Sequence, residues 1–135
     1  MRFNIFSGSR DGNGLAAALT NPTTLSRRKG TVQQDYPVEY AGKVWPDAEH
    51  AFLMLQVEEE AYDDLIMVDI IAAKFKQHLR LAEAVQQRGG VNFLEKCEHF
   101  TGAKTPRFAA WEGYGRESRF IRNLIAGYEK WEQTQ

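Results

Sequence analysis

The sequence predicts an α+β fold, a mainly helical single domain over residues 1–135 with a small β-sheet. Apolar residues recur every three or four positions through most of the chain after residue 47, which is typical of helices with one buried face. Short stretches before that point instead alternate polar and apolar side chains, as strands do. A chain of this length buries roughly two thirds of its unfolded surface, so it suits one domain that needs no disulfide.

The composition indicates no strong electrostatic partner for the molecule as a whole. The 17 basic and 18 acidic residues give a formal net charge of −1, which supplies no overall attraction to nucleic acid or to an anionic membrane. The single cysteine, Cys97, cannot form an internal disulfide and belongs to no zinc-binding cluster. No apolar stretch approaches the roughly 20 residues that span a bilayer, and the N-terminal residues do not resemble a secretion signal. We therefore expect a cytoplasmic protein with no membrane association.

The first quarter of the chain predicts short elements joined by polar loops. Residues 2–6, RFNIF, alternate polar and apolar side chains and predict a strand. Residues 7–14, SGSRDGNG, predict a turn-rich loop, and residues 15–19 begin a short helix that the following TNPTT ends. Residues 26–36 are expected to form a polar connection that carries three adjacent basic residues.

A hairpin and a helix start come next. Residues 37–45, PVEYAGKVW, predict two short strands around a central Ala-Gly turn. Pro46 and Asp47 then indicate the start of a helix, because proline suits the first turn and aspartate caps free backbone N–H groups. The apolar positions that follow at helical spacing, and that predict its buried face, are Ala48, Ala51, Phe52 and Leu55.

The remaining chain predicts three more helices, one strand and a long loop. A second helix is expected over residues 63–78 and a third over residues 79–90, which two glycines close. Residues 91–100, VNFLEKCEHF, predict a strand. Residues 101–117 are a loop rich in glycine and aromatic side chains, and a final helix is expected over residues 117–131.

Glu49 lies in the first turn of the helix that begins at Asp47, and its role is open on position alone. Unpaired N–H groups and the helix dipole favour a carboxylate there, so Glu49 could simply stabilise the helix end. His50 could likewise be a hydrogen-bonded histidine at the rim of the core. Gln56, however, projects from the same face as Glu49, roughly 10 Å along the axis. That face is separate from the apolar stripe, which leaves room for a chemical site.

Residues 42–52, GKVWPDAEHAF, resemble the G-K-x-W/Y-P-x-x-E-H-x-F/Y signature of the NADAR superfamily. The resemblance continues in the same order through most of the chain. The further matching segments are LTNPT (residues 19–23), AAKFKQHLRLAEAV (residues 72–85), FLEKCEHFT (residues 93–101) and WEGYGRESRFIRNLI (residues 111–125).

The resemblance implies an α+β fold whose pocket holds a ribosyl phosphate or ADP-ribose. It also implies that the chain is an N-glycosidase, which is a hydrolase acting on N-glycosyl bonds. Its best-known members resemble the N-glycosidase that acts on phosphorylated riboflavin-pathway intermediates. By position, Glu49 would be the catalytic carboxylate, Trp111 the aromatic pocket wall and Asn21 a pocket residue. No cofactor and no metal are implied. The partner would be a small-molecule N-riboside or an ADP-ribose-type ligand.

The chain departs from the family at two of these positions. Family members often carry a lysine seven residues after the glutamate, where some are thought to form an imine with the opened ribose. Gln56 stands there in this chain, and its amide cannot form an imine. Ser118 stands near the position where the family carries asparagine.

Hydrolysis of an N-ribosyl bond passes through an oxocarbenium-like transition state, which one carboxylate can stabilise while it also orients or deprotonates water. We expect the helix start to keep Glu49 ionised for this role. Donors for a phosphate would come from basic side chains, including Arg10, and from glycine N–H groups in residues 7–14. The candidate ligand-binding residues are Asn21, Lys43, Trp45, His50, Gln56, Trp111, Tyr114, Arg116, Ser118 and Arg119.

Two other functions fit the same residues. A binding module could sequester an ADP-ribose or NAD-derived ligand without cutting it. A hydrolase could instead remove ADP-ribose from nucleic-acid bases, since Arg27, Arg28 and Lys29 form a basic run and some NADAR relatives act on DNA. A solvated loop explains that run equally well.

Overall fold

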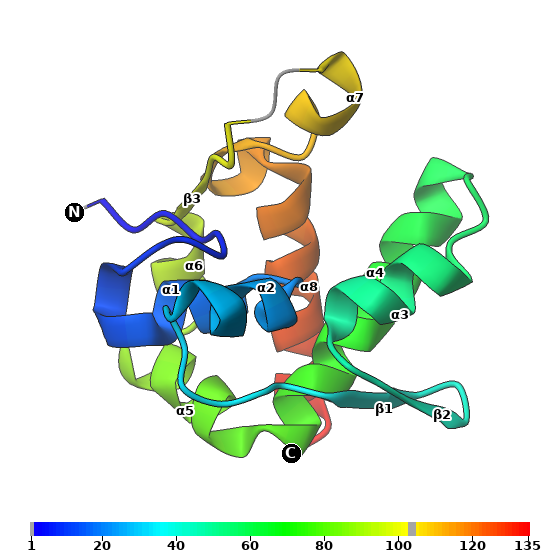
Figure 1. Cartoon of the computed structure of the whole chain (residues 1–135), viewed down its shortest axis with the longest axis horizontal. Coiled ribbons are helices and arrows are strands. Elements are labelled where there is room, and N and C mark those ends of the chain that lie inside the picture. Colours follow the sequence, from blue (N-terminus) through cyan, green and yellow to red (C-terminus); the bar gives the residue numbers. More distant parts are fainter. Residues whose placement is uncertain (1, 103–104) are drawn as a thin grey trace.

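Two long helices, α4 (Glu60–Gln77) and α8 (Arg119–Gln133), pack along each other through the middle of the molecule (Figure 1). The two backbones come close at Gly127, because a Cβ atom built on that glycine would lie 2.5 Å from Cγ2 of Ile71. A larger residue at this position would push the helices apart. The α4–α8 pair therefore forms the core on which the other elements pack.

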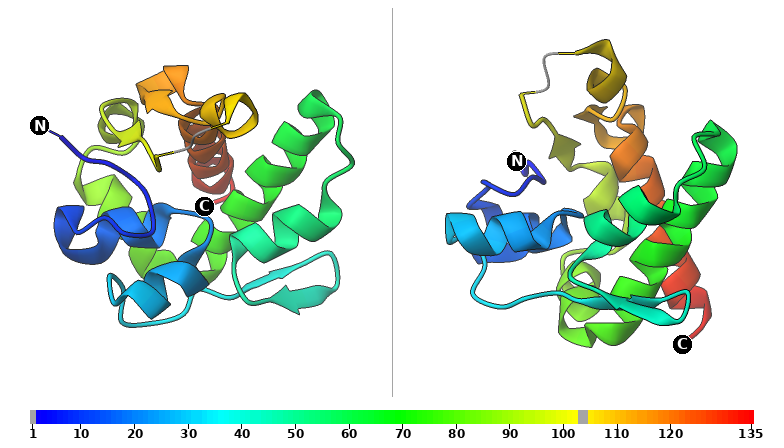
Figure 2. Two further views of the ribbon diagram at one scale, coloured as in Figure 1. Left: turned by 45° about the horizontal axis from the view of Figure 1, so that its top comes forward. Right: turned by 45° about the vertical axis from the view of Figure 1, so that its right-hand side comes forward.

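The computed structural model describes residues 2–102 and 105–135, and for Arg107 the backbone alone. Figures 1 and 2 show α3 running beside the first turns of α4, and α6 on the side of α8 away from α4. Before α4 the chain forms η1 (Asp11–Gly14), α1 (Leu15–Leu19), α2 (Thr23–Lys29), β1 (Val38–Tyr40), β2 (Lys43–Trp45) and α3 (Ala48–Leu55). Between α4 and α8 it forms α5 (Leu79–Gln87), α6 (Val91–Glu95), β3 (Glu98–His99), α7 (Pro106–Ala109), β4 (Gly113–Tyr114) and η2 (Gly115–Glu117).

The described residues are mainly helical with a small amount of β-structure, which confirms the predicted balance of elements. Strands β1 and β2 pair antiparallel with Val38 opposite Trp45, so the hairpin predicted over residues 37–45 is confirmed. The helix predicted from Asp47 is also confirmed, because the Asp47 side chain caps α3 by accepting a hydrogen bond from the backbone N–H of His50.

A second small sheet pairs β3 with β4, and the strand predicted over residues 2–6 is wrong. In that segment Asn4 alone makes a β-bridge, to Glu98. Its possible partner, β3, is two residues long and already pairs with β4 on its other side. The N-terminal segment is nevertheless held, since the N–H of Ile5 donates to the Glu98 carbonyl at 2.8 Å.

The first part of the connection predicted over residues 26–36 is helical, because residues up to Lys29 belong to α2. The side chain of Ser26 is buried and donates a hydrogen bond to the carbonyl of Ala17 at 2.9 Å, which packs α2 on α1. Gly30 then ends the helix with a left-handed backbone. The polar composition of the segment concealed this packing.

The strand predicted over residues 91–100 is wrong for its first half, which forms α6. Gly90 turns the chain with a positive φ, and its carbonyl accepts the first helical bond, from the N–H of Leu94. Phe93 and Leu94 are both buried, which a short helix achieves as well as a strand. The β-rich composition of VNFL therefore could not decide between the two.

A buried lysine ties α4 to the end of α1. Lys74 is 2% exposed, and its Nζ donates to the carbonyls of Ala18 and Thr20 at 2.7 and 2.8 Å. Burial lowers the pKa of Lys74 to about 7, although the negative charge of Asp47 opposes this. The contact fixes the chain just before α2, where it enters the candidate site.

We predict that the contribution of Lys74 to stability rises with pH above neutrality. The unfolded chain keeps the lysine proton up to about pH 10.4, whereas the folded chain releases it near pH 7. Because the unfolded state binds more protons in between, the free energy of unfolding increases across that window. Urea denaturation of the wild type and of Lys74→Met should therefore show the wild type gaining stability relative to the variant from pH 7 to pH 10.

Lys76→Met removes an exposed lysine from the same helix and serves as the control for loss of a positive charge. A difference between wild type and Lys74→Met that does not change with pH would contradict the prediction.

Candidate functional site

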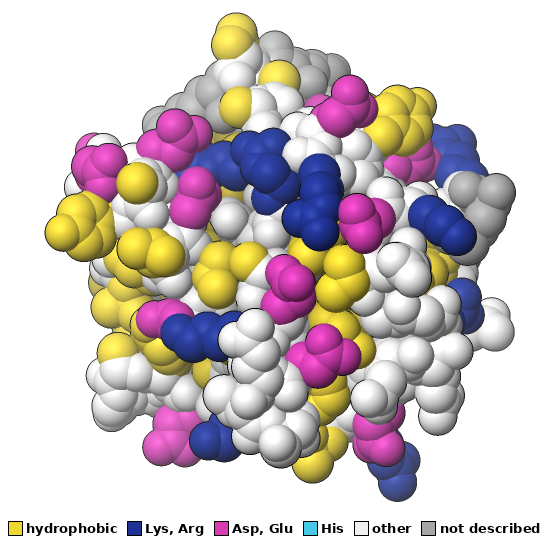
Figure 3. All heavy atoms as spheres, turned by 180° about the vertical axis from the view of Figure 1, so that it is seen from behind, with side chains coloured by type: hydrophobic (Ala, Val, Ile, Leu, Met, Phe, Trp, Pro, Cys, Tyr) yellow, Lys and Arg dark blue, Asp and Glu magenta, His cyan; other side chains and the backbone are white. Residues whose placement is uncertain are grey.

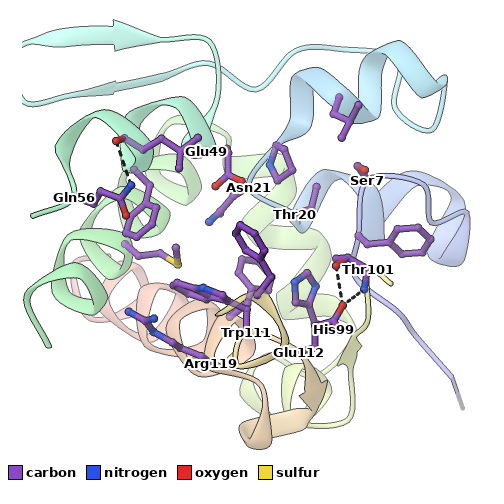
Figure 4. A pocket seen from close by; sticks show the side chains of 18 of the residues that line it. Ser7, Thr20, Asn21, Glu49, Gln56, His99, Thr101, Trp111, Glu112 and Arg119 are labelled. Atoms are coloured by element: carbon purple, nitrogen blue, oxygen red, sulfur yellow. Dashed lines mark hydrogen bonds between the residues drawn. The ribbon is translucent and has the colours of Figure 1, made fainter. Parts of the chain in front are cut away.

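A cavity of about 890 Å³ opens between α2, α3, the start of α4 and the segment around residues 99–120 (Figure 4). Its volume is that of an ordinary small-molecule site. The residues that line it include Ser7, Thr20, Asn21, Lys29, Glu49, Phe52, Gln56, Asp63, His99, Thr101, Phe108, Trp111, Glu112 and Arg119.

Glu49 is held at the cavity by the capping of α3. The carboxylate of Asp47 is fully buried, and it accepts hydrogen bonds from the backbone N–H and hydroxyl of Thr24, at 3.0 and 2.8 Å, as well as from His50. These bonds join α2 to the first turn of α3. The backbone N–H of Glu49 donates to the carbonyl of Asn21 at 3.3 Å, which fixes the same turn against the chain before α2.

The pKa values of the two carboxyl groups in this turn, Asp47 and Glu49, are shifted in opposite directions. Burial by itself would raise the pKa of Asp47, but the hydrogen bonds from His50 and Thr24 outweigh it and hold that pKa below its ordinary value. Burial raises the pKa of Glu49, the nearby charge of Asp47 raises it further, and His50 opposes both. Two neighbouring carboxyls are thus divided into an ionised structural group and a group that keeps its proton to higher pH.

That the helix start keeps Glu49 ionised stays a prediction. Removal of water from the carboxyl and repulsion by Asp47 favour the protonated form and raise the pKa, whereas His50 favours the ionised form. Glu49 is half-buried and lines the cavity, so it is open to a ligand. A carboxyl with a raised pKa is suited to exchange protons with a bound molecule.

Trp111 lies across the cavity from Glu49 (Figure 4), and Phe52 of α3 completes an aromatic wall. The rings of Trp111 and Phe52 meet edge to face with centroids 6.0 Å apart. The guanidinium of Arg119 lies 3.9 Å from the centre of a Trp111 ring, and its Nε donates to Asp64 at 2.7 Å. Arg119 therefore braces the tryptophan and is itself oriented by a carboxylate.

Ser118 does not line the cavity but supports this wall. Its hydroxyl donates to the carbonyl of Trp111 at 2.6 Å and accepts from the N–H of Ile121 at 3.1 Å, so it caps α8. The side chain is fully buried. One hydroxyl thus joins the start of α8 to the segment that carries the tryptophan.

Lys43, Trp45 and His50 lie outside the cavity lining. Lys43 is on the hairpin, with Nζ 4.7 Å from the centre of the Trp45 ring, and the indole N–H of Trp45 donates to the Tyr40 carbonyl at 2.9 Å. The His50 ring lies 2.6 Å from Asp47 through Nδ1 and is otherwise exposed. Trp45 is buried in the core, whereas Lys43 and His50 are exposed. Their closeness to Glu49 in the sequence therefore does not place these three side chains at the cavity.

Tyr114 and Arg116 also lie outside the lining. Tyr114 is 64% exposed and meets Phe100 edge to face at 4.9 Å. Arg116 pairs with Glu95 of α6 at 3.0 Å. The glycines on both sides of Tyr114 have positive φ, which turns this stretch away from Trp111. Five of the candidates, Asn21, Glu49, Gln56, Trp111 and Arg119, do come together around the cavity.

The sequence interpretation missed His99 and Lys29, which also line the cavity. His99 is buried, and its Nδ1–H donates to the Ile5 carbonyl at 2.5 Å. Burial lowers the pKa of His99, which favours the neutral ring with Nε2 free to accept a hydrogen bond. Lys29 donates from Nζ to the hydroxyl of Ser7 at 2.7 Å. The basic run of residues 27–29 predicted a positive charge at Lys29 but not that this side chain lines the cavity. No local pattern in the sequence indicated His99 as a site residue.

Within residues 2–102 and 105–135, His, Cys, Asp and Glu side chains do not gather in threes in a way that could hold a metal ion. Across the same part of the chain, none of the helices has the length and apolar character needed to cross a bilayer. A scan against protein-family models and searches of curated proteins and of solved structures gave no match to the chain.

We predict that Ser118→Ala lowers the free energy of unfolding by about 1–2 kcal/mol, because it removes a helix cap and the shorter of two hydrogen bonds to the Trp111 carbonyl, which keeps only the N–H of Phe120 at 3.4 Å. Urea denaturation measures the loss. Glu117→Ala, an exposed neighbour in η2, is the matched control. Equal stabilities of the two variants would show that the hydroxyl does not anchor the wall.

Proposed function

We propose that this chain is an N-glycosidase that hydrolyses the N-glycosidic bond of a ribosyl-phosphate or ADP-ribose-type substrate, with Glu49 as its catalytic carboxylate. The observation that carries the proposal is the position of Glu49, half-buried in a cavity of ligand size with a raised pKa and an aromatic wall opposite. The resemblance of residues 42–52 to the NADAR signature supports it, since the glutamate of that signature is the residue at the cavity.

The cavity offers distinct surroundings to the parts of such a substrate. Trp111 and Phe52, whose rings meet edge to face, form an apolar surface for the ring that leaves. Lys29 and the hydroxyl of Ser7 provide donors for a phosphate at the other end, in place of the basic residues that the sequence analysis favoured. In this arrangement the sugar lies between these two ends, next to Glu49.

In the proposed reaction the bond between C1′ and the ring nitrogen breaks as positive charge grows on the sugar. Glu49 in its carboxylate form stabilises that charge and takes a proton from the attacking water, whose oxygen bonds to C1′. Glu49 then passes this proton to the nitrogen of the departing ring, or to solvent where a cationic ring leaves neutral without a proton, so the products are a free ribose derivative and the neutral base. The raised pKa of Glu49 makes its carboxylate a stronger base toward the attacking water.

The side chain at position 56 favours a second function, in which the protein is a module that sequesters the ligand without cutting it. Gln56 lines the cavity near Glu49, and its amide donates to the Leu53 carbonyl at 3.5 Å. An imine cannot form at this side chain. A cavity that binds the ligand and releases no base would perform this second function.

A nucleic-acid substrate also has an observation in its favour. A second cavity, of about 950 Å³, adjoins Gly30 and is lined by Arg10, Lys76 and Arg80 without any acidic residue among its described lining. Arg27 and Lys29 of the basic run are engaged by Asp35 and Ser7, which leaves Arg28 exposed beside them. The molecular face in Figure 3 carries acidic and basic side chains intermixed, which offers no continuous basic track there.

We predict that Glu49→Gln abolishes base release while the fold is retained, because the amide keeps the shape of the side chain but can neither take up a proton nor carry a charge. A mass-spectrometric screen of N-ribosides with the wild type and the variant measures release, and thermal unfolding measures the fold. Glu83→Gln, an exposed glutamate on α5, is the control and should behave as the wild type.

Full activity of Glu49→Gln would remove Glu49 from the mechanism. Calorimetry with ADP-ribose that shows binding by the wild type, together with no released base in the screen, would favour the sequestering module.

A further inference from the structure

The side-chain amide of Asn21 lines the cavity next to Glu49 and has an unpaired oxygen (Figure 4). Asn21 is 5% exposed, and its Oδ1 accepts no hydrogen bond from any residue that the structure describes. Buried polar atoms are almost always paired, because a group removed from water without a partner is unfavourable. An unpaired acceptor at a cavity wall therefore indicates a donor that arrives with a ligand.

Among the described residues, Thr23, Tyr128 and Trp131 also have a buried side-chain atom without a partner. None of those three lines the cavity, so a ligand there would not reach them. Asn21 differs because its unpaired atom belongs to a lining residue beside the candidate catalytic carboxyl. Of these four residues, Asn21 alone can meet a ligand in this cavity.

The backbone around Asn21 holds the amide in place. Its carbonyl accepts hydrogen bonds from the N–H groups of Thr23 and Glu49 at 2.9 and 3.3 Å. The preceding carbonyl, of Thr20, accepts from Nζ of Lys74 at 2.8 Å. A proline follows and fixes the chain further. An acceptor fixed in this way discriminates between ligands better than a mobile one.

The surroundings indicate which ligand donor meets this oxygen. Glu49 and Asn21 lie on the same side of the cavity, across from Trp111 and Arg119 (Figure 4). If the departing ring lies on the Trp111 side and Glu49 acts at C1′, the group beside C1′ on the Asn21 side belongs to the sugar. The hydroxyl on the adjacent carbon, C2′, is the hydrogen-bond donor nearest to the reacting centre, and an amide oxygen can only accept.

We infer that Asn21 accepts a hydrogen bond from the 2′-hydroxyl of the substrate and makes the cavity selective for ribosyl over 2′-deoxyribosyl ligands. The inference depends on the proposed function, because it assumes that the sugar is bound with C1′ at Glu49. A 2′-deoxy ligand would leave the buried oxygen unpaired. Sites with an unmet polar group reject such analogues strongly, so we expect a preference on the order of 10- to 100-fold.

The test compares wild type, Asn21→Ala and Asn92→Ala, the last being a matched change at an exposed asparagine on α6. The probes are nicotinamide mononucleotide and the four common nucleoside 5′-monophosphates, each with its counterpart that differs only in lacking the 2′-hydroxyl. Released base gives kcat/KM, calorimetry gives the dissociation constant, and thermal unfolding checks each fold. Intrinsic differences in bond lability cancel when the ribo-to-deoxy ratio is compared between variants.

We expect the ribo-to-deoxy ratio of the wild type and of Asn92→Ala to exceed that of Asn21→Ala by about 10- to 100-fold. Equal ratios in all three proteins would overturn the selectivity while leaving N-glycoside hydrolysis standing. If no probe releases base, the proposed function fails, and the binding ratio from calorimetry then decides the inference alone. Failure of all probes to bind would overturn both.

Discussion

The buried carboxylate of Asp47 is the contact on which the arrangement of the cavity depends. It caps α3 through the N–H of His50, and it accepts two hydrogen bonds from Thr24 of α2. The first turn of α3 and the start of α2 are therefore placed by one group. Glu49 lies in that first turn of α3, and its N–H donates to the carbonyl of Asn21 just before α2, so both residues take their positions at the cavity from this arrangement.

Asp47 also determines the chemistry of its neighbour. Its own pKa is lowered by the bonds it accepts, although burial acts the other way, so it remains charged near Glu49. That charge adds to the burial of Glu49 and raises the pKa of the second carboxyl. A structural cap thus raises the pKa of a carboxyl that lines the cavity. The buried Lys74 acts beside it by fixing the Thr20 carbonyl ahead of Asn21.

Local patterns in the sequence predicted the parts of the fold that local physics determines. Pro46 and Asp47 indicate a helix start, and alternation around an Ala-Gly turn indicates a hairpin, and both appear as predicted. The buried face of α4 shows where such patterns fall short. It includes Lys74 beside Met67 and Ile71, because a lysine that donates to two carbonyls can occupy a core position.

The candidate site could be predicted only where one segment carries it. Glu49 and Gln56 share a helix face, so their meeting at the cavity follows from helix geometry. His99 and Lys29 arrive from distant segments, and their directions are set by the Ile5 carbonyl and by Ser7. Such directions depend on tertiary contacts that no spacing in the sequence reports. Arg116 is the opposite case. Its position in the sequence predicted a ligand-binding role, but its side chain forms an ion pair with Glu95.

Catalysis at this cavity depends on Glu49 being a desolvated carboxyl whose pKa is raised by its surroundings. The most direct measurement is an NMR titration of the side-chain carboxyl carbon of Glu49 in the free protein, with Glu49→Gln to assign the signal. The midpoint should lie above 4.5, the ordinary value for a glutamate, because burial and Asp47 raise it. A midpoint at or below 4.5 would show that the helix start and His50 outweigh burial and Asp47, and that Glu49 has no raised pKa to bring to catalysis.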